Sequence, residues 1–550
     1  MSSGPAPGSA APKQDTARVA GRGFLFIAFA KLYFMISGFG LNILLPRFLE
    51  RGARRIVEAG LGAGRTVAQV GQALYGDYGV VNRFTSVLNN TVVTATIQAV
   101  SKYVAEDERG APAVRALALR MQAVIGFLLS GAYALAAGLI ARYAYNDPDL
   151  ARYFRIAAVI LFAYSIYAVF IGYLNGTTRF SRQAGFDMTF STVKVGSMLG
   201  VALLGYGVDA LFAAFGAAAV FICIAAAVVV GVRRGDARRD LPPGVLLRAW
   251  GTIAAYNLVI NLLLAVDLSV LKWAAAGAAV GLPADVVQDL SSSLSGIYFG
   301  VLNWSTIPYQ AVLAVAFVVF PLVSRSTFDQ DREGTKAYIT NTLRYALLLV
   351  GLIGIVFAAS PTELLRILNK EYEVGSTALT ISIAGQVGLA LFSIANAILI
   401  AAGRMGTALG IAVATAVADL VSNALVVPRF IRLLPAAPGV APAFDPVALT
   451  AGAAATAPAL GLGALLGLWA LSRSFGAALP FATAGRVLLV GGVLVAACHF
   501  GPHFGLVLTV GKSILVMGAY LGGLFVLREF GPEDRARFAR VVRRGGGGGK

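Results

Sequence analysis

Five polar side chains recur at intervals of three or four residues between Gly76 and Glu106. They are Arg83, Ser86, Asn90, Thr94 and Gln98. On an α-helix this spacing places all five on one face. A guanidinium group binds anions through a bidentate fork, and hydroxyl and amide groups exchange hydrogen bonds with polar ligands. The stripe therefore indicates a wet surface that can bind a polar molecule.

The helix that carries this stripe is long enough to cross a membrane. Tyr78 to Val100 would rise about 35 Å at ~1.5 Å per residue. The stripe itself is too polar to face lipid, and the valine residues of this segment lie mainly on its other faces. We therefore expect a membrane helix that lines a water-filled cavity.

The composition of the whole chain supports a membrane protein. Of its 550 residues 58% are hydrophobic and 13% are charged, and the mean hydropathy is +0.76, values far from those of soluble domains. The net charge of +18 suits cytoplasmic loops, which collect Lys and Arg, so we expect no nucleic-acid partner. Cys223 and Cys498 lie in apolar runs and indicate no disulfide framework.

Fourteen apolar segments are long enough to be membrane spans. They cover residues 23–45, 78–100, 117–141, 153–174, 185–206, 208–232, 249–271, 297–323, 340–359, 376–402, 406–428, 447–471, 485–500 and 505–527. With the N-terminus inside, Lys and Arg are about twice as frequent on the cytoplasmic side as on the other side. We therefore expect both termini in the cytoplasm, with residues 1–22 as a disordered tail and residues 528–550 as a basic tail.

A charged, proline-containing segment, residues 233–246, follows the sixth span as a hydrophilic linker would. Beyond it, YFGVLN at 298–303 echoes YGVVN at 78–82, which predicts two six-helix repeats of like orientation. The fold class that we expect is an all-α polytopic membrane protein of about 14 helices, with two lobes around a central cavity. The expected domains are an N-lobe at 23–232, a C-lobe at 247–472 and two extra helices at 473–527.

Three cations of the first lobe are expected at membrane depth, where a charge costs several kcal/mol (~2.5–3.5) unless it faces a cavity or a partner. Lys31 and Arg83 either line the cavity or extend to the membrane interface. Arg83 shares the stripe with Asn90, which favours the cavity. Lys194 either lines the cavity or pairs with Asp187, seven residues earlier on the same face.

Two carboxylates of the second lobe and Lys512 of the extra helices also lie in predicted spans. Asp267 either acts as a capping residue near the outer membrane interface or forms an ion pair with Lys272. Asp419 has Asn423 one turn further on, and it is the better candidate for a buried carboxylate that binds H⁺ or Na⁺.

The segment between the first two spans, residues 47–75, is unusually basic. It contains Arg47, Arg51, Arg54, Arg55 and Arg65. One interpretation is a short amphipathic helix on the outer face, and the other is a basic mouth that meets an anionic headgroup.

No motif for enzyme chemistry is present in the sequence. We find no phosphate-binding P-loop, no HExxH motif and no paired carboxylates at glycosidase spacing. His499 and His503 are separated by Gly501-Pro502, which should break a helix that placed both on one face. We therefore expect neither an enzyme nor a metal site.

Four features together carry a family resemblance. They are YGDYGVVNRF at 75–84 with IQAVSKYVAE at 97–106, the layout of six, six and two spans, NLLLAVDLSVLK at 261–272, and the prolines at 308 and 321. The chain resembles the polysaccharide-export flippases of the multidrug/oligosaccharidyl-lipid/polysaccharide exporter superfamily, which also contains the lipid II flippase and the multidrug and toxin extrusion antiporters. The resemblance covers nearly all of residues 23–527 and departs from the family at 47–75 and 433–446.

The resemblance implies a flippase of the bacterial inner membrane that uses no cofactor. It would move an undecaprenyl-pyrophosphate-linked oligosaccharide repeat unit to the outer leaflet by alternating access, for polysaccharide or O-antigen export. Its partners would include a polysaccharide polymerase and glycosyltransferases. The cavity residues would be Arg83, Lys31 and Lys194 for the pyrophosphate, with Asn82, Ser86, Asn90, Thr94 and Asn303, and Asp419 or Asp267 would couple transport to H⁺ or Na⁺.

Three other functions remain open from the sequence. A lipid II flippase for peptidoglycan synthesis would also have cationic spans in its first lobe. A cation-coupled multidrug antiporter would need an anionic cavity, against the charge of the first lobe seen here. A scaffold that transports nothing is the third.

Overall fold

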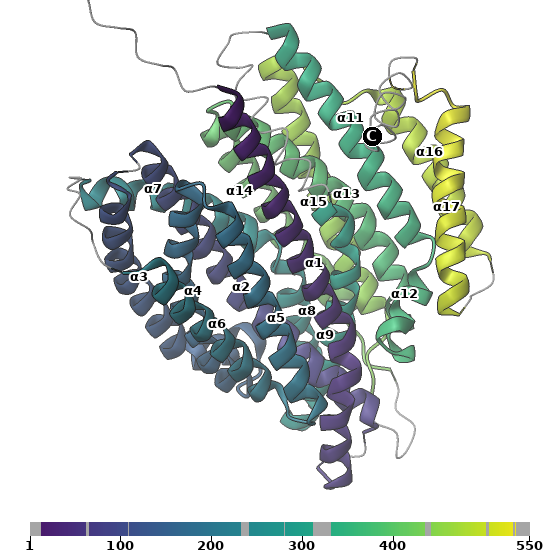
Figure 1. The fold of residues 1–550 in the computed structure, drawn as a ribbon. Coiled ribbons are helices and arrows are strands. Elements are labelled where there is room, and N and C mark those ends of the chain that lie inside the picture. The colour runs from purple at the N-terminus through teal and green to yellow at the C-terminus, as the bar shows by residue number, and fades with distance from the viewer. Residues whose placement is uncertain are drawn as a thin grey trace, which may run out of the picture.

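The computed structural model describes residues 13–61, 65–107, 109–232, 241–279, 281–311, 332–434, 442–501, 505–531 and 534. Within these ranges the chain is built of helices (Figure 1). The N-terminal helices are α1 (Lys13–Glu58), α2 (Val67–Glu106), α3 (Ala111–Leu139), η1 (Ile140–Ala144), α4 (Leu150–Gly176), α5 (Phe180–Leu203) and α6 (Val208–Val230). The central ones are α7 (Pro243–Leu263), α8 (Val266–Ala278), α9 (Ala284–Ser305), α11 (Arg332–Ala358), α12 (Pro361–Leu368) and η2 (Lys370–Gly375). The C-terminal ones are α13 (Ser376–Ala401), α14 (Met405–Phe430), α15 (Val447–Phe475), α16 (Phe481–His499) and α17 (Leu506–Val526).

The chain is a multi-pass membrane protein. In its described part 11 helices are long and apolar enough to cross a membrane. Three further helices, α2, α5 and α9, have 40, 24 and 22 residues and are long enough to cross but more polar. The predicted all-α polytopic fold is confirmed, with 14 spans as an approximate number. Parts of the eighth predicted span, of the linker and of both tails lie outside the described residues.

The structure corrects the interpretation of residues 47–75. α1 has 46 residues, about 69 Å at ~1.5 Å per residue, so residues 47–58 continue a membrane helix and do not form a separate one. Thr66 and Gln69 form a capping box that starts α2 directly afterwards. Arg47 donates to the Leu368 carbonyl oxygen over 3.3 Å and Arg51 to that of Leu203 over 3.1 Å. Arg51, Arg54 and Arg55 are exposed, so the basic mouth stays a prediction.

The seventh predicted span, residues 249–271, is two helices. α7 ends at Leu263 and α8 begins at Val266. The Oδ1 atom of Asp267 accepts a hydrogen bond of 2.7 Å from the backbone N–H of Leu268, in the first turn of α8. A carboxylate is stabilised at a helix N-terminus by the free N–H groups and the helix dipole, which favours a new helix start here.

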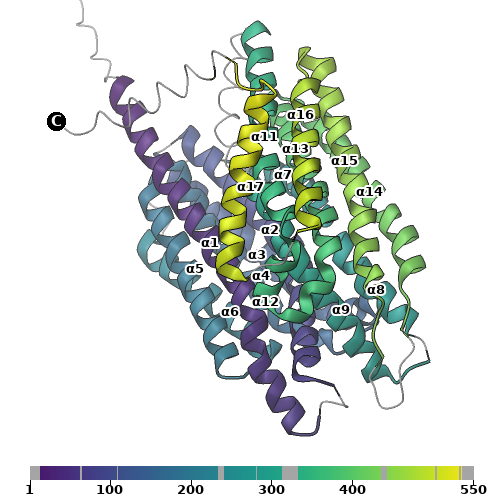
Figure 2. The ribbon, with the colours of Figure 1, turned by 90° about the vertical axis from the view of Figure 1, so that its right-hand side faces the viewer.

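The helices form two groups with α1 between them (Figure 1). α2 to α6 lie on one side, and α11, α13 and α15 lie on the other. α7 follows the linker in sequence but packs against α2 through the Trp250 indole, which donates to Thr96 over 3.1 Å. α16 and α17 pack against α11 at the edge of the second group (Figure 2).

We name the two ends of the bundle after what they carry. The η2 end carries η2, the residues between η1 and α4, and the bridge between Leu433 and Phe444. The linker end carries the residues that flank 233–240 and the segment after α17.

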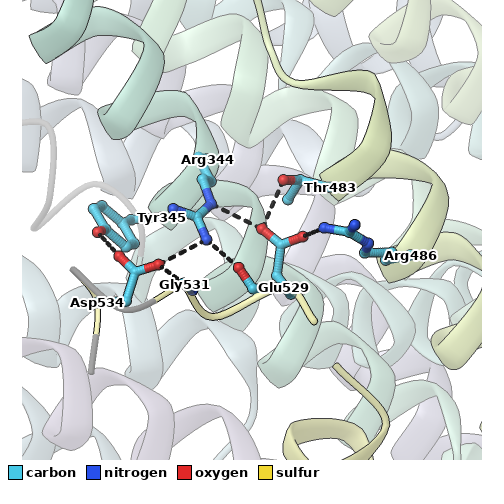
Figure 3. Close-up of polar contacts among 7 residues, drawn as sticks. All are labelled: Arg344, Tyr345, Thr483, Arg486, Glu529, Gly531 and Asp534. Carbon is cyan, nitrogen blue, oxygen red and sulfur yellow. Dashed lines mark hydrogen bonds and ion pairs between the residues drawn. The ribbon is translucent and has the colours of Figure 1, made fainter. Parts of the chain in front are cut away.

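At the linker end, ion pairs hold the segment after α17 to α11 and α16. Arg344 of α11 lies between two carboxylates, with its Nε 2.8 Å from Glu529 Oε1 and its Nη2 3.0 Å from Asp534 Oδ2 (Figure 3). Arg486 and Thr483 of α16 also bind Glu529, each over 2.7 Å. Burial works to raise the pKa of Glu529, but hydrogen bonds from Arg344, Arg486 and Thr483 outweigh it and hold the pKa below its usual value.

This cluster predicts a stability that depends on pH. A carboxylate whose pKa is depressed in the folded state stabilises the fold at any pH above its pKa in the unfolded chain. This stabilisation is lost as the pH falls through its pKa in the folded state. At pH 7, Glu529→Gln should unfold at a lower temperature than the parent, by the equivalent of about 1–2 kcal/mol because the site borders solvent. The difference should shrink below about pH 4. Equal melting of the two proteins at pH 7 would show that the cluster does not stabilise the fold.

Candidate functional site

A polar cluster combines side chains of α2, α8, α9 and α14. The charge of Arg83 on α2 interacts with Asp267 of α8 and with Tyr298 of α9. The Tyr298 hydroxyl lies 3.5 Å from Asp267 Oδ2. Asp419 of α14 is buried and interacts electrostatically with Asp267. The predicted anion-binding residue and the two predicted cation-coupling residues are thus within electrostatic range of one another, without an ion pair between Arg83 and Asp267 among the described residues.

The carboxylate of Asp419 is only partly satisfied. Its Oδ1 accepts a hydrogen bond of 2.9 Å from Asn423, which also lies 2.9 Å from Thr456 Oγ1 of α15. Its Oδ2 is buried and has no hydrogen-bond partner among the described residues. A buried carboxylate in this state favours a proton or a cation.

A cavity of about 10 Å³ adjoins Asp267, about the size of one water molecule or ion. Asp267, Thr456 and Gln386 line it, and Gln386 Oε1 is a buried oxygen without a hydrogen-bond partner in the described part of the chain. Oxygen atoms of this kind are ligands for hard cations. Among the described residues no group of three His, Cys, Asp or Glu side chains could hold a metal ion.

The stripe on α2 runs from this cluster toward the linker end. Its five residues are exposed or half-buried, whereas Val81, Thr85 and Val92 on the opposite face are buried. Asn90 donates a hydrogen bond of 3.2 Å to Asn261 of α7, so α7 covers one side of the stripe. Asn82, also predicted for the site, is half-buried beside Arg83.

The two predicted lysines lie at the contact between α1 and α5. Lys31 Nζ is 3.6 Å from Asp187 Oδ2 and its side chain is 59% exposed. Lys194 Nζ lies over the rings of Phe34, Phe190 and Phe215, at 5.2, 5.9 and 5.0 Å from their centroids. The alternative in which Lys194 pairs with Asp187 is therefore wrong, because Asp187 forms its ion pair with Lys31 of α1.

Asn303 is part of a joint between three helices. Asn42 of α1 donates to Asn303 Oδ1 over 3.2 Å, and Asn303 Nδ2 donates to the Tyr75 hydroxyl of α2 over 2.9 Å. That hydroxyl donates to the Asn42 carbonyl oxygen over 3.0 Å. The structure thus uses this predicted cavity residue to join α1, α2 and α9.

Sequence reasoning missed a buried ion cluster nearer the η2 end. Lys272 is fully buried, and its Nζ lies 2.8 Å from Asp147 Oδ2 and 3.1 Å from Asp77 Oδ1. Ser292 of α9 binds both Lys272 and Asp77. The alternative in which Asp267 pairs with Lys272 is wrong, because two residues five positions apart on a helix point in different directions. The cluster ties α2 and the turn before α4 to α8 and α9.

Beside this cluster α2 and α9 touch through their backbones. A Cβ atom on Gly76 would lie 1.8 Å from the Ser292 carbonyl oxygen, and one on Gly296 would lie 2.1 Å from that of Gln72. Only glycine permits such a close approach. Phe299 covers Gly79 one turn further on. This crossing closes α2 against α9 on the η2 side of the polar cluster.

Comparisons with known proteins agree with this architecture. Residues 73–239, which begin in α2, match the family described as polysaccharide biosynthesis protein. The lipid II flippase MurJ in an inward closed conformation superposes with a TM-score of 0.68 at 12% identity, over 92% of this chain and 99% of MurJ. The chain has the fold of the MOP superfamily. The fold that the resemblance to these exporters implies is thereby confirmed.

Two other MOP superfamily structures are similar over most of their length. An inward-facing multidrug resistance MATE family transporter has a TM-score of 0.54 at 14% identity, over 78% of this chain and 95% of its own. A MOP superfamily transporter from Pyrococcus furiosus, whose binding pocket is described as reversed in polarity, has a TM-score of 0.52 at 13% identity, over 84% and 96%. No curated protein matches the sequence.

Proposed function

We propose that this MOP-fold chain is a flippase for an undecaprenyl-pyrophosphate-linked oligosaccharide repeat unit in polysaccharide or O-antigen export. The observation that carries the proposal is Arg83, a half-buried cation at the end of the polar stripe on α2. Its Nε atom is buried without a hydrogen-bond partner in the described part of the chain, so part of the guanidinium remains available to an anion. The match to a polysaccharide biosynthesis family covers this helix.

The proposed transport path follows from the two ends of α2. The linker end faces the cytoplasm of a bacterium, where the headgroup enters along Ser86, Asn90 and Thr94. The pyrophosphate reaches Arg83, and the α2–α9 crossing blocks further movement. When the lobes rock, α2 separates from α9 and the headgroup leaves at the η2 end, while the lipid tail stays in the membrane.

Two alternatives share the fold. A lipid II flippase would use the same cations for the same pyrophosphate chemistry. A cation-coupled antiporter is favoured by Asp267 and Asp419, but Arg83 beside Asp267 opposes binding of a cationic drug.

The experiment uses cells whose own copy is deleted. Deletion should abolish surface glycan and leave lipid-linked repeat units in the inner leaflet, and the full-length chain should restore export. Unchanged surface glycan together with higher drug sensitivity would favour the antiporter. Failure of cell-wall synthesis would favour the lipid II flippase.

Orientation gives a prediction of its own. Because Lys and Arg are about twice as frequent on the side of the linker, both termini and the linker should be cytoplasmic. Arg238→Cys should resist a membrane-impermeant thiol reagent in intact cells and react after permeabilisation. Rapid labelling in intact cells would reverse the topology.

Asp419 is proposed as the residue that binds the driving cation. Asp419→Asn keeps the shape of the side chain but removes the charge, so export that depends on a H⁺ or Na⁺ gradient should be lost at a normal protein level. The control is Asp209→Asn, because Asp209 is 48% exposed and pairs with Arg152 far from the cluster. Normal export by Asp419→Asn would make this carboxylate a structural one.

A further inference from the structure

A second polar cavity opens at the η2 end, on the far side of the α2–α9 crossing from Arg83. Its volume is about 500 Å³, within the range of ~300–1,000 Å³ that small-molecule sites occupy. The first turns of α2 and α9, η2 and residues 442–446 form its walls. Gln72 lies at its base, and its carbonyl oxygen is the group that a Cβ on Gly296 would meet. The cavity therefore begins where the closed crossing ends.

The base of the cavity carries a connected set of polar groups. Ser293 Oγ donates to Gln72 Oε1 over 2.9 Å, and Gln72 Nε2 lies 3.5 Å from Glu371 Oε2. Gln72 is 5% exposed, whereas Glu371 is exposed. At the rim, Arg65 forms an ion pair of 2.7 Å with Asp289. Hydroxyl, amide and carboxylate groups at short range are what a polyhydroxylated ligand needs, because each of its hydroxyls both donates and accepts.

The other wall is apolar. Phe444, Pro446 and Ile297 line it. Phe444 is held in place by its antiparallel bridge to Leu433, beside which the Leu434 N–H donates to the Ala443 carbonyl oxygen over 2.8 Å. A pyranose ring presents C–H groups on its faces and hydroxyls at its edge, so an apolar wall opposite a polar base fits it. The charges add specificity, because two carboxylates and one guanidinium disfavour a phosphate or an acidic sugar.

We propose that this cavity is a saccharide-binding site for neutral or amino sugars, placed where the headgroup leaves the transport path. The inference rests on the proposed function for how the glycan reaches the site. The site binds sugar rings and not the pyrophosphate, which Arg83 holds on the other side of the crossing.

The test places a thiol at the base of the cavity. In a chain with Cys223→Ala and Cys498→Ala, Ser293→Cys is exposed to a membrane-impermeant maleimide in nanodiscs. Cellobiose and N-acetylchitobiose, as free disaccharides up to about 10 mM, should slow the labelling in a saturable manner, since a Kd of ~1 mM is then exceeded tenfold. Labelling of Leu61→Cys, which is 72% exposed near the same end, should not change.

Binding should also respond to the two walls separately. Glu371→Gln and Phe444→Ala should each weaken protection by about tenfold, the loss of one charge-assisted hydrogen bond or one ring contact. Arg83→Ala should leave protection unchanged, because it lies beyond the crossing. Glu371 and Phe444 lie on different elements, so misfolding of one variant would not explain a loss of protection in both.

The outcomes separate this inference from the proposed function. If no disaccharide protects Ser293→Cys in a chain that still exports lipid-linked glycan, the saccharide site is wrong and the flippase stands. If disaccharides protect while lipid-linked glycan is not transported, the site is supported and the flippase is wrong. Protection that Glu371→Gln and Phe444→Ala both leave intact would place the sugar elsewhere and overturn the proposal.

Discussion

Arg83→Glu is expected to abolish export of lipid-linked glycan while the protein still inserts in the membrane. The substitution places a third carboxylate beside Asp267 and Asp419 and turns an attraction for pyrophosphate into a repulsion. Arg83→Ala should reduce export by about ten- to hundredfold, the cost of a lost charge-assisted hydrogen bond. Arg83→Lys should retain only part of the export, since lysine lacks the bidentate fork of arginine.

The measurement is surface glycan per molecule of inserted protein. Arg54→Glu is the matched control, because it makes the same charge change at an exposed position on α1 and should export normally. A structural role for Arg83 predicts loss of protein from the membrane. Normal export by Arg83→Glu would remove the main support for the cationic cavity.

Lys272→Met is expected to have the largest effect on stability. The substitution leaves Asp77 and Asp147 close together without their buried counter-charge, and breaking a buried pair in this way costs about 3–5 kcal/mol. The purified variant should melt well below the parent. It should also favour separation of α2 from α9, so that Ser86→Cys becomes reactive from the η2 end.

The control removes all three charges together. Lys272→Met combined with Asp77→Asn and Asp147→Asn leaves no uncompensated charge, and neutral replacement of a buried ion pair is often tolerated. This triple variant should recover most of the lost stability. If Lys272→Met alone melts like the parent, the cluster does not hold the crossing closed.

Much of the fold is predictable because its signals are local. Membrane helices show in composition and length, and the stripe on α2 shows in a period of 3.6 residues. Helix ends that extend beyond the apolar core are harder to detect. Residues 47–58 resemble a loop because they are charged, yet they continue α1. Residues 67–75, which precede the predicted second span, already belong to α2.

Contacts between helices are not predictable in the same way. Asp187 and Lys194 share a face of α5, but the partner of Asp187 is Lys31 of α1. Lys272 meets carboxylates from α2 and from the turn before α4. The sequence contains no sign of which helices are neighbours, so such pairs require the three-dimensional structure.

The most direct test of the flippase proposal uses purified chain in proteoliposomes. A fluorescent disaccharide on undecaprenyl pyrophosphate is placed in both leaflets, and an impermeant quencher reports how fast lipid from the inner leaflet reaches the outer one. The proposal predicts transfer well above protein-free vesicles, lost in Arg83→Glu and kept in Arg54→Glu. Transfer equal to that of protein-free vesicles, or equal in the parent and Arg83→Glu, would contradict it.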